Sequence, residues 1–533
     1  MKASSTSAIF VASLLLLSGC GGKKISEGAS EEKADSLYSE VPEIPSMLPD
    51  TLFPSARNIR YVIDCREDSS SGIINYTGDM YCNAPGAFTF RNRPLRQADF
   101  GGKVAGTPDT IIIDWKFETG YDTTRTAFGI WGGGTGWTGQ PLYVEWPDSC
   151  VKIFKQTNSL TPNFNKRELI VGSLAGKVYF INPDNGEESR LPIDAGNPIK
   201  GTPSLDPTMN GNLYVGHGIP ARKPFGTVTI NLYKHEVTDS FDRDPKAWRG
   251  WGAYDSSPLR AGQFLFRPGE NNTLYKYSVS GANLTLHSEL RYTVNGSAPG
   301  IESSMCIYRN YGYICDNHGN IICINLNTLK PIWLYRLEDD IDATPVLEIE
   351  DGNPYLYVGC EVDRQGTGEA SFVKLDAMSG SEIWKTELEC ERVEVKEKHF
   401  DGGYYASALP GRGNCNNLIF SNCVRNNRGQ NGEFIAFNRN TGEIEYSIPL
   451  KYYAWSSPVG FMNEKNEMFI LTGDTAGNLY IINGAEGKIV TSRRVGGNFE
   501  SSPVVFGNSA VVGSRGRYIY KVSIQQIKQG QSC

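Results

Sequence analysis

The stretch that decides the fold is Gly176-Lys177-Val178-Tyr179-Phe180-Ile181-Asn182-Pro183-Asp184-Asn185-Gly186. After the opening glycine, residues 177–181 suit a β-strand, because β-branched and aromatic side chains dominate them. The Asn, Asp and Gly that follow are residues that tight turns favour. The stretch therefore predicts one strand of an antiparallel sheet held between two turns.

Copies of this pattern recur along the chain. Clear copies begin at Gly319, Ser371, Gly432 and Gly477, and weaker ones begin at Gly226, Asn272 and Arg517. Self-similarity at a spacing of tens of residues is the signature of a repeat architecture. We therefore expect one repeated unit to make up most of the protein.

A second marker is a small hydroxyl residue, often followed by proline, that opens a short apolar strand. Its members are Thr202-Pro203, Ser257-Pro258, Thr344-Pro345, Ser457-Pro458 and Ser502-Pro503, with Ser304 and Ser407 in the same place without proline and Thr126 as a degenerate first member. The spacing of roughly 40 to 75 residues suits four strands and variable loops per unit. Eight starts predict an all-β protein, an eight-bladed β-propeller of four-stranded antiparallel blades.

The two ends of the repeat region complement each other. The last unit, which begins at Ser502, has room for only three strands. The segment 110–118 precedes the first start and is similar to the outer strands of other units, such as Glu382-Ile383-Trp384-Lys385. Pairing this segment with the last three strands would leave no exposed edge. We expect a ring closed by an N-terminal strand that joins the C-terminal blade.

Composition supports the fold class and excludes one class of partner. The chain has 58 Gly, 27 Tyr and 23 Phe, with only 21% charged residues, which is typical of short strands joined by tight turns. Its formal net charge is -7, and acidic and basic residues are interspersed. Nucleic-acid binding requires clustered Lys and Arg. We therefore expect no nucleic-acid partner.

The first residues have the layout of an export signal. An apolar run over residues 9–17 is followed by small residues and then by a cysteine. The run is too short for a bilayer core of roughly 30 Å. The sequence Leu17-Ser18-Gly19-Cys20 resembles the lipobox of bacterial lipoproteins, which implies cleavage before Cys20 and acylation of that cysteine. We expect a protein of the cell envelope that is anchored to the membrane by its lipid.

Two features refine the expected location and organisation. Gly21 follows the lipidated residue, which resembles the pattern of lipoproteins sent to the outer membrane, with the membrane face left open. The predicted segments are a signal peptide (1–19), a flexible tether rich in Ser, Glu, Lys and Pro (20–57), a small N-terminal element (58–107), the propeller (108–525) and a C-terminal tail (526–533).

Eleven cysteines remain after Cys20, an odd number in an oxidising compartment. Cys65 and Cys82 form a candidate disulfide, because a small element with little core gains most from a crosslink. Cys415 and Cys423 suit a bridge within one blade better than a metal site.

The complete unit resembles the pyrroloquinoline-quinone-type (PQQ-like) propeller repeat. The resemblance covers roughly residues 108–525 and lies in the small-residue-Pro opening, the Gly turn, the alternating strand, the Asn/Asp-x-x-x-Gly turn and the outer strand with Trp. That repeat is shared by quinoprotein dehydrogenases and by BamB-like outer-membrane assembly lipoproteins, so it implies the fold more strongly than the activity.

The dehydrogenases of this type use a vicinal disulfide, a Trp floor and a calcium ion beside a catalytic Asp. Here no two cysteines are adjacent, no haem attachment motif is present, and the five histidines have no metal-ligand spacing. We therefore predict no cofactor, no metal and no catalytic residues. The acidic run at 338–342 is interpreted as a charged inter-blade loop.

Two loops rich in Trp and Gly are the candidate surface for a ligand or a partner. They carry Trp131 and Trp137 in the first, and Trp248 and Trp251 in the second. Tryptophan and arginine in extended loops are typical of protein-binding hot spots. For the first loop a structural role is the alternative, since glycine also fits where an inner strand crowds the axis.

The leading hypothesis is a membrane-anchored, non-enzymatic scaffold that binds an envelope protein, with outer-membrane protein assembly as a specific version. Two alternatives stay open: a propeller that binds carbohydrate or a small ligand through the Trp/Gly loops, and a PQQ-dependent dehydrogenase. The sequence does not distinguish the partner or the ligand.

Overall fold

The computed structural model describes residues 48–66, 74, 79–98, 101–137, 139–364, 367–395, 398–425 and 431–526. Contacts divide the chain into Met1–Pro45 and Ser46–Cys533, and every described residue belongs to the second unit. The predicted signal peptide, Cys20 and most of the tether lie outside the described residues, as does the tail after residue 526. The lipid anchor therefore stays a prediction.

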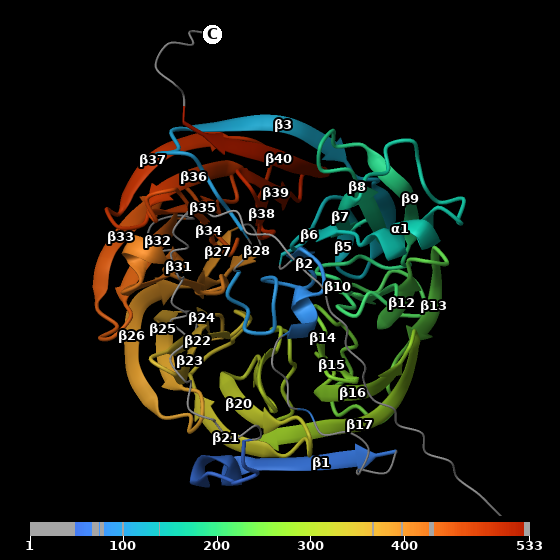
Figure 1. The fold of residues 1–533 in the computed structure, drawn as a ribbon. Helices are drawn as coiled ribbons and strands as arrows, with labels where there is room; N and C mark the ends of the chain where they lie inside the picture. Colours follow the sequence, from blue (N-terminus) through green and yellow to red (C-terminus); the bar gives the residue numbers. More distant parts are fainter. Residues whose placement is uncertain are drawn as a thin grey trace, which may run out of the picture. The chain divides into compact units, whose positions relative to one another are not determined.

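Eight antiparallel sheets stand around a central axis as the blades of a propeller (Figure 1). We number them in chain order. Blade 1 comprises β6 (Leu142–Glu145), β7 (Arg167–Gly172), β8 (Lys177–Ile181) and β9 (Glu188–Asp194); blade 2 comprises β10 (Ser204–Leu205), β11 (Asn212–Gly216), β12 (Thr227–Asn231) and β13 (Glu236–Phe241); blade 3 comprises β14 (Leu259–Ala261), β15 (Phe264–Gly269), β16 (Thr273–Ser280) and β17 (Asn283–Val294); blade 4 comprises β18 (Cys306–Tyr308), β19 (Tyr311–Cys315), β20 (Asn320–Asn325) and β21 (Pro331–Arg336).

The second half of the ring has the same organisation. Blade 5 comprises β22 (Val346–Glu350), β23 (Asn353–Gly359), β25 (Thr367–Asp376) and β26 (Glu382–Glu391); blade 6 comprises β30 (Leu409–Pro410), β31 (Leu418–Arg425), β32 (Asn431–Asn438) and β33 (Ile444–Leu450); blade 7 comprises β34 (Val459–Met462), β35 (Met468–Gly473), β36 (Asn478–Asn483) and β37 (Lys488–Arg494); blade 8 comprises β38 (Val504–Phe506), β39 (Ser509–Gly513), β40 (Tyr518–Gln525) and β3 (Thr110–Glu118). The predicted eight-bladed, all-β architecture is confirmed.

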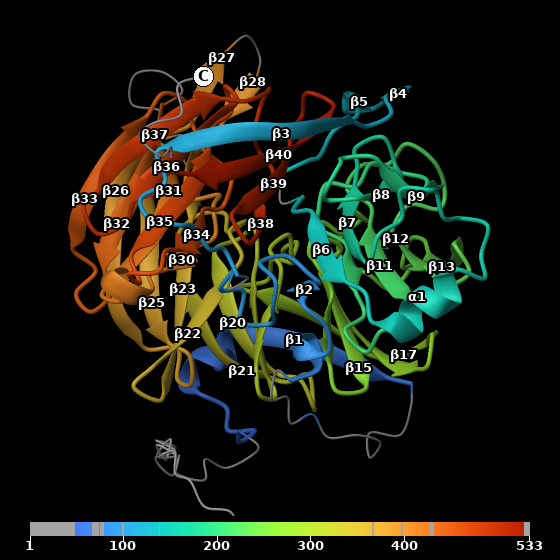
Figure 2. The same cartoon turned by 45° about the horizontal axis from the view of Figure 1, so that its top comes forward.

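Blade 8 takes its outer strand from a distant part of the chain. Strand β3 pairs antiparallel with β40 from Thr110↔Gln525 to Glu118↔Tyr518. Figure 2 shows β3 lying across the C-terminal strands. The edge of β40 is thereby covered, which removes a surface that could pair with another chain.

The remaining elements add to the blades or project from them. They are β1 (Ile59–Cys65) on the outer edge of blade 3, β2 (Gly86–Ala87) on the inner edge of blade 1, β24 (Glu361–Val362) and β29 (Gly402–Gly403) on blade 6, the hairpins β4 (Asp122–Thr126)–β5 (Gly129–Gly132) and β27 (Val393–Val395)–β28 (Lys398–Phe400), the helix α1 (Asp148–Phe154), and the 3₁₀ turns η1 (Pro54–Asn58), η2 (Asp79–Cys82) and η3 (Gly413–Cys415). No described helix is long and apolar enough to cross a membrane.

The marker hydroxyls link neighbouring blades around most of the ring. The backbone N–H of Ser304 donates to Thr344 Oγ1 at 3.0 Å, and the N–H of Thr344 donates to Ser407 Oγ at 3.1 Å. Equivalent bonds of 2.7–3.0 Å join Gln140 to Thr202, Ser257 to Ser304, Ser407 to Ser457, and Ser457 to Ser502. A small hydroxyl is required because it is the acceptor for a buried amide.

This pattern corrects one prediction. Thr126 lies in the β4–β5 hairpin, outside every blade, and does not open the first one. The equivalent position in blade 1 is Gln140, whose N–H donates to Thr202 Oγ1. The prediction was wrong because the marker was defined by a hydroxyl, and blade 1 has an amide side chain there.

The Asn/Asp-x-x-x-Gly turns pack against the outer strand of the preceding blade. Trp333 in blade 4 donates from Nε1 to the Ala377 carbonyl at 3.1 Å, and its ring covers Gly380, where a Cβ would come within 2.6 Å of the indole. Gly442 lies under Trp384 in the same way. The turn glycine therefore makes room for an aromatic ring, in addition to accepting a positive φ.

Residues 86–98 and 101–104 fill one end of the central channel, and we call them the plug. The plug crosses the middle of the ring in Figure 1 and extends the inner strands of several blades. Its backbone bonds are Leu205 N–H to Phe88 O, Ile307 N–H to Pro94 O, Leu347 N–H to Leu95 O, Met462 N–H to Gly102 O, and Lys103 N–H to Gly507 O, all at 2.7–3.0 Å. The stretch predicted as a small N-terminal element is thus divided between β1 on the outside and the plug on the axis.

Two fully buried arginines hold the plug in place. Arg96 donates to the carbonyls of Met305 at 2.8 Å and Ser257 at 3.0 Å. Arg91 donates to the carbonyls of Ala408 and Pro458. A guanidinium has five N–H donors, so it can satisfy inner-strand carbonyls that have no strand partner at the axis. The plug is therefore bonded to blades on opposite sides of the ring.

Candidate functional site

The side chains two positions before each marker converge above the plug. They are Lys200, Asp255, Glu302, Asp342, Tyr405, Trp455 and Glu500, and we call them the axial ring. Each lies on the segment that enters an inner strand, so the blades place them around the axis. Plug residue Phe90 lies beneath them and lines a narrow gap together with Trp137, Asp342, Tyr405 and Trp455. The region enclosed by the ring is termed the axial cup.

One half of the cup is acidic. Asp255, Glu270 and Glu302 each present a carboxylate oxygen within 4.8 Å of the others. Asp340, Asp342 and Glu361 continue this half toward blade 6, and the Asp342 N–H donates to Glu361 Oε1 at 3.3 Å. Oxygen ligands of this kind suit a hard cation such as Ca²⁺. Asp255, Glu270 and Glu302 are therefore the residues that could hold a metal.

Lys200 is the cation of the axial ring. Its Nζ contacts Asp255 and lies 3.2 Å from Glu302 Oε1. Burial works against the charged ammonium, but the carboxylates of Asp255, Glu302 and Glu270 outweigh it and hold the pKa of Lys200 well above its ordinary value. The ammonium thus occupies a position that a bound cation would otherwise take.

The acidic half contains more charge than Lys200 can balance. Burial raises the pKa of Asp255 to about 6, with Glu302 adding to the effect and Lys200 opposing it. Burial and neighbouring carboxylates also raise the pKa values of Glu270 and Asp342 well above their ordinary range. Oδ1 of Asp342 and Oε1 of Glu270 have no hydrogen-bond partner among the described residues. Perturbed, unsatisfied groups of this kind are typical of a functional site.

The other half of the cup is aromatic. Tyr405 packs edge-on against Trp137, with ring centroids 5.7 Å apart, and lies at a tilt against Trp455, with ring centroids 5.0 Å apart. Tyr453 continues the cluster at 5.1 Å from Trp455. The Lys200 ammonium lies 5.7 Å from the centre of the Trp137 ring and so connects the two halves.

A second feature lies at the rim, where the β4–β5 hairpin meets the loops of blades 2 and 3. Figure 2 shows this hairpin projecting beyond the blades. Phe128 at its tip is 54% exposed and packs edge-on against Trp251 at 5.2 Å. The Phe225 ring centre lies 6.0 Å from that of Trp251. Phe225 and Trp251 line a groove of about 530 Å³, which we call the rim groove.

Charged side chains flank the rim groove. Arg222 forms ion pairs with Asp122 of the hairpin at 3.1 Å and with Asp194 at 3.2 Å. These pairs tie the hairpin to the loop that carries Phe225. Lys223 and Arg243 also line the groove. The aromatic rings are therefore held open to solvent on a supported surface.

The four tryptophans of the candidate loops lie in different places in the structure. Trp251 lies in the rim groove and Trp248, 41% exposed, is close to it in the chain. Trp137 is only 8% exposed, in the wall of the cup. Trp131 stacks on the Arg515 guanidinium at 4.8 Å. Whether any of them binds a ligand or a partner stays a prediction.

The axial ring was not recognised in the sequence. Asp342 was interpreted as part of a charged inter-blade loop; it does lie on the connection between blades 4 and 5, but its side chain is buried in the cup. A usable signal existed, because each ring residue stands two positions before a marker. Cys65 and Cys82 are both exposed and are free thiols in the structure, so their pairing stays a prediction.

Comparisons with known proteins bear on the fold. No protein-family model matches the chain, and no curated protein matches it. Among solved structures it is similar to a europium-containing methanol dehydrogenase, with 12% identity over 83% of this chain and 98% of that one and a TM-score of 0.55. The quinohemoprotein alcohol dehydrogenase from Comamonas testosteroni gives 11% identity over 88% and 84%, with a TM-score of 0.57.

The shared feature is the fold. At these identities the likeness confirms the predicted PQQ-like propeller and nothing about activity. BamB from Moraxella catarrhalis also matches, with 15% identity over 69% of this chain and 95% of that one, but its TM-score of 0.46 carries no inference.

The cup does not fit the quinone that such dehydrogenases bind. That cofactor is a polycarboxylate, whereas the cup already holds more carboxylates than its lysine can balance. The gap lined by Phe90, Trp137 and Tyr405 is also too narrow to hold even a water molecule, so it leaves no room for a multi-ring cofactor. A cation fits the donor set of the acidic half, and an anionic cofactor does not.

Proposed function

We propose that this chain is a membrane-anchored, non-enzymatic propeller that acts as a protein-binding scaffold in the cell envelope. The observation that carries the proposal is the rim groove with its neighbour Phe128, which is 54% exposed and packs against groove residue Trp251 on a hairpin held by the Arg222–Asp122 ion pair. Exposed aromatic clusters of this kind are typical of interaction sites. The lipobox at Cys20 supports the membrane anchor.

The rim carries further apolar side chains beside the groove. Tyr121 and Ile130 of the hairpin region are 51% and 52% exposed, on the same projecting element as Phe128. The plug supports a rigid platform, because it bonds the blades to one another across the axis. A rigid surface loses little conformational entropy when it binds.

A photo-crosslinking amino acid at position 128 of the lipidated protein tests the proposal in native membranes. We expect a discrete adduct that Trp251→Ala weakens. The matched control is the same crosslinker at Ile349, which is 47% exposed on blade 5. Equal labelling at both positions would contradict a specific interface. Loss of the adduct with Cys20→Ala would support anchoring as a requirement.

The identity of the crosslinked protein tests whether the scaffold acts in outer-membrane protein assembly. An outer-membrane assembly component would support a role in outer-membrane protein assembly, and any other envelope protein would rule that role out while keeping the scaffold.

Reconstitution with PQQ and calcium, followed by a dye-reduction assay, tests the dehydrogenase alternative. We expect no reduction of the dye, and turnover would overturn the non-enzymatic assignment.

Carbohydrate binding is the second candidate, and the rim groove itself favours it. Its volume of about 530 Å³ lies within the usual range for ligand pockets, roughly 300–1,000 Å³. Trp251 and Phe225 offer stacking faces, and Lys223 and Arg243 offer donors. Calorimetric titration with glycans would show heat that Trp251→Ala removes. Absence of heat with the unaltered protein would eliminate this candidate.

A further inference from the structure

The structure brings together two cysteines that are far apart in the sequence. Sγ of Cys390 in β26 lies 3.8 Å from Sγ of Cys423 in β31, and both residues are buried. They belong to different blades, so this contact joins blade 5 to blade 6. Cys423 was expected to pair with Cys415, but Cys415 lies in η3, where its thiol contacts Asn414. That expectation is corrected by the geometry.

The contact lies at one end of the seam between these blades. On β25, Gly368 pairs with Cys390 and Lys374 pairs with Trp384. Six residues of extended strand therefore separate the thiols from Lys374, which is about 20 Å. The Lys374 end adjoins the plug, because Gln97 Nε2 donates to the Leu347 carbonyl there at 2.8 Å.

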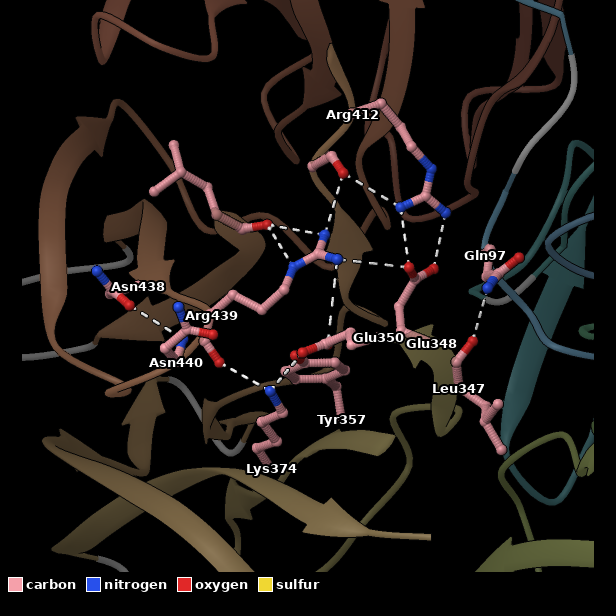
Figure 3. Close-up of polar contacts among 12 residues, drawn as sticks. Gln97, Leu347, Glu348, Glu350, Tyr357, Lys374, Arg412, Asn438, Arg439 and Asn440 are labelled. Atoms are coloured by element: carbon pink, nitrogen blue, oxygen red, sulfur yellow. Dashed lines mark hydrogen bonds and ion pairs between the residues drawn. The ribbon is translucent and has the colours of Figure 1, made fainter. Parts of the chain in front are cut away.

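At the plug end of the seam, ion pairs and hydrogen bonds join blade 5 to blade 6, as Figure 3 shows. Arg412 forms a bidentate pair with Glu348, with N–O distances of 2.7 and 3.0 Å. Arg439 lies 3.5 Å from Glu348 and donates to the Gly411 carbonyl at 3.0 Å. Lys374 pairs with Glu350 at 2.6 Å. At the Cys390 end, Arg392 lies 2.8 Å from Asp401 and 3.5 Å from Asp363, which flank strands β29 and β24 of blade 6.

We propose that Cys390 and Cys423 form a disulfide that staples blade 5 to blade 6 at the cup end of the seam. The proposal rests on the proposed export of the chain in one respect: export supplies the oxidising compartment in which the bond forms. Adjacent Tyr404 and Tyr405 lie just before the inner strand of blade 6, and Tyr405 belongs to the axial ring. The staple would therefore fix part of the aromatic wall of the cup.

The chemistry is exchange with a disulfide oxidant, such as glutathione disulfide or a disulfide-bearing oxidase. One of the two cysteine thiolates attacks the oxidant, forms a mixed disulfide and releases one thiolate. The other thiolate then attacks the sulfur of the first cysteine, forms the Cys390–Cys423 bond and releases the second thiolate. Two thiols are oxidised and the oxidant accepts two electrons and two protons. Burial places this step during folding, before the blades close over the sulfurs.

The environment distinguishes the two sulfurs. A hydrogen bond from the Cys423 thiol lowers the pKa of Cys390, with burial opposing and Arg425 assisting. Burial raises the pKa of Cys423 well above its ordinary value. In the folded protein Cys390 is therefore the more acidic of the two thiols.

Peptide mapping tests the proposal on the full chain. The protein is refolded in a glutathione redox buffer, alkylated under denaturing conditions and cut with trypsin without reduction. We expect peptide 386–392, which contains Cys390, to be linked to peptide 413–425. The second peptide also contains Cys415, so Cys415→Ser is the matched control and keeps the linkage, whereas Cys423→Ser abolishes it. Recovery of Cys390 and Cys423 as alkylated thiols from folded protein would overturn the proposal.

A second measurement covers variants that fail to fold. Reduction of the unaltered, refolded protein should lower its guanidinium midpoint, and Cys390→Ser should remove that shift. A midpoint unchanged by reduction would count against a bond that staples the seam. If the bond forms on refolding but is absent from protein isolated from cells, the disulfide stands and the proposed export fails, so the two failures are distinguishable.

Discussion

The two ends of the central channel use charge in opposite ways. At the plug end, Arg91 and Arg96 are fully buried, yet their guanidinium groups donate to backbone carbonyls of several blades. At the cup end, buried carboxylates such as Asp342 and Glu270 retain oxygens without a hydrogen-bond partner among the described residues. One end is saturated with hydrogen bonds and the other is not.

This difference distinguishes buried charged residues that stabilise the fold from those that serve a function. Buried polar groups normally find partners, because an unsatisfied one costs free energy of folding. The plug follows that rule, so its arginines are explained by stability alone. The cup departs from it, and the departure marks the cup as a place where the chain gives up stability. Substitutions at each end of the channel test this difference.

The largest effect is expected at the plug. Arg96→Met leaves the Met305 and Ser257 carbonyls without their donor and should lower the free energy of unfolding by more than about 4 kcal/mol, which is exceptional for one residue. Guanidinium unfolding monitored by Trp fluorescence measures it. The matched control is exposed Arg93→Met, expected to change stability by less than about 0.5 kcal/mol. Equal effects of the two variants would show that the plug does not hold the ring.

The next effect is expected at Lys200. Lys200→Met removes the ammonium from Asp255 and Glu302 and leaves buried carboxylates uncompensated, which costs roughly 3–5 kcal/mol. Denaturant unfolding at pH 8 measures the change, with exposed Lys234→Met as the control. A neutral result would indicate that the acidic half is not charged in the folded protein. Rescue by millimolar Ca²⁺ would show that a metal can replace the ammonium.

The blades could be predicted from the sequence because the residues that signal them lie close together in the chain. A marker such as Ser304 and a turn glycine such as Gly380 are visible within a few residues, and the structure shows what each does: the hydroxyl accepts an amide from the preceding blade, and the glycine lies under a Trp ring. The pairing of β3 with β40 was also predictable, because the last unit lacked a strand.

The plug and the cup were not predictable in the same way. The segment around Arg91 and Arg96 has the Arg, Asn and Pro content of a solvated loop, and its burial depends on carbonyls that converge only when all blades surround the axis. The axial ring has a spacing signal, since Asp255 and Asp342 stand two positions before a marker, but their mutual proximity is a property of the ring. The same holds for the Cys390–Cys423 contact, which joins two blades.

A smaller effect, of opposite sign, is expected at Asp342. Burial and neighbouring Glu302 and Glu361 raise its pKa in the folded state, so the folded protein binds this proton more tightly than the unfolded chain. Its contribution to stability is present below the ordinary carboxyl pKa and is lost as pH rises through the raised value. Asp342→Asn should therefore stabilise the protein at pH 8 by roughly 1–3 kcal/mol and have little effect near pH 4.

Unfolding at several pH values measures this difference, with exposed Asp351→Asn as the matched control. A parallel shift at every pH would contradict the raised pKa. Asp255, whose pKa is raised to about 6, should give the wild type a further loss of stability between pH 4 and pH 6.

The smallest effect is expected between the two ends, in the ring of marker hydroxyls. Ser304→Ala removes the acceptor of the Ser257 amide and should cost about 1 kcal/mol, the usual net value of one hydrogen bond. Exposed Ser297→Ala is the control, and denaturant midpoints compare the two. Because each hydroxyl carries one bond, the same cost should recur at Ser407 and Ser457. A loss several times larger at one position would show that the ring, and not the plug, holds that blade in place.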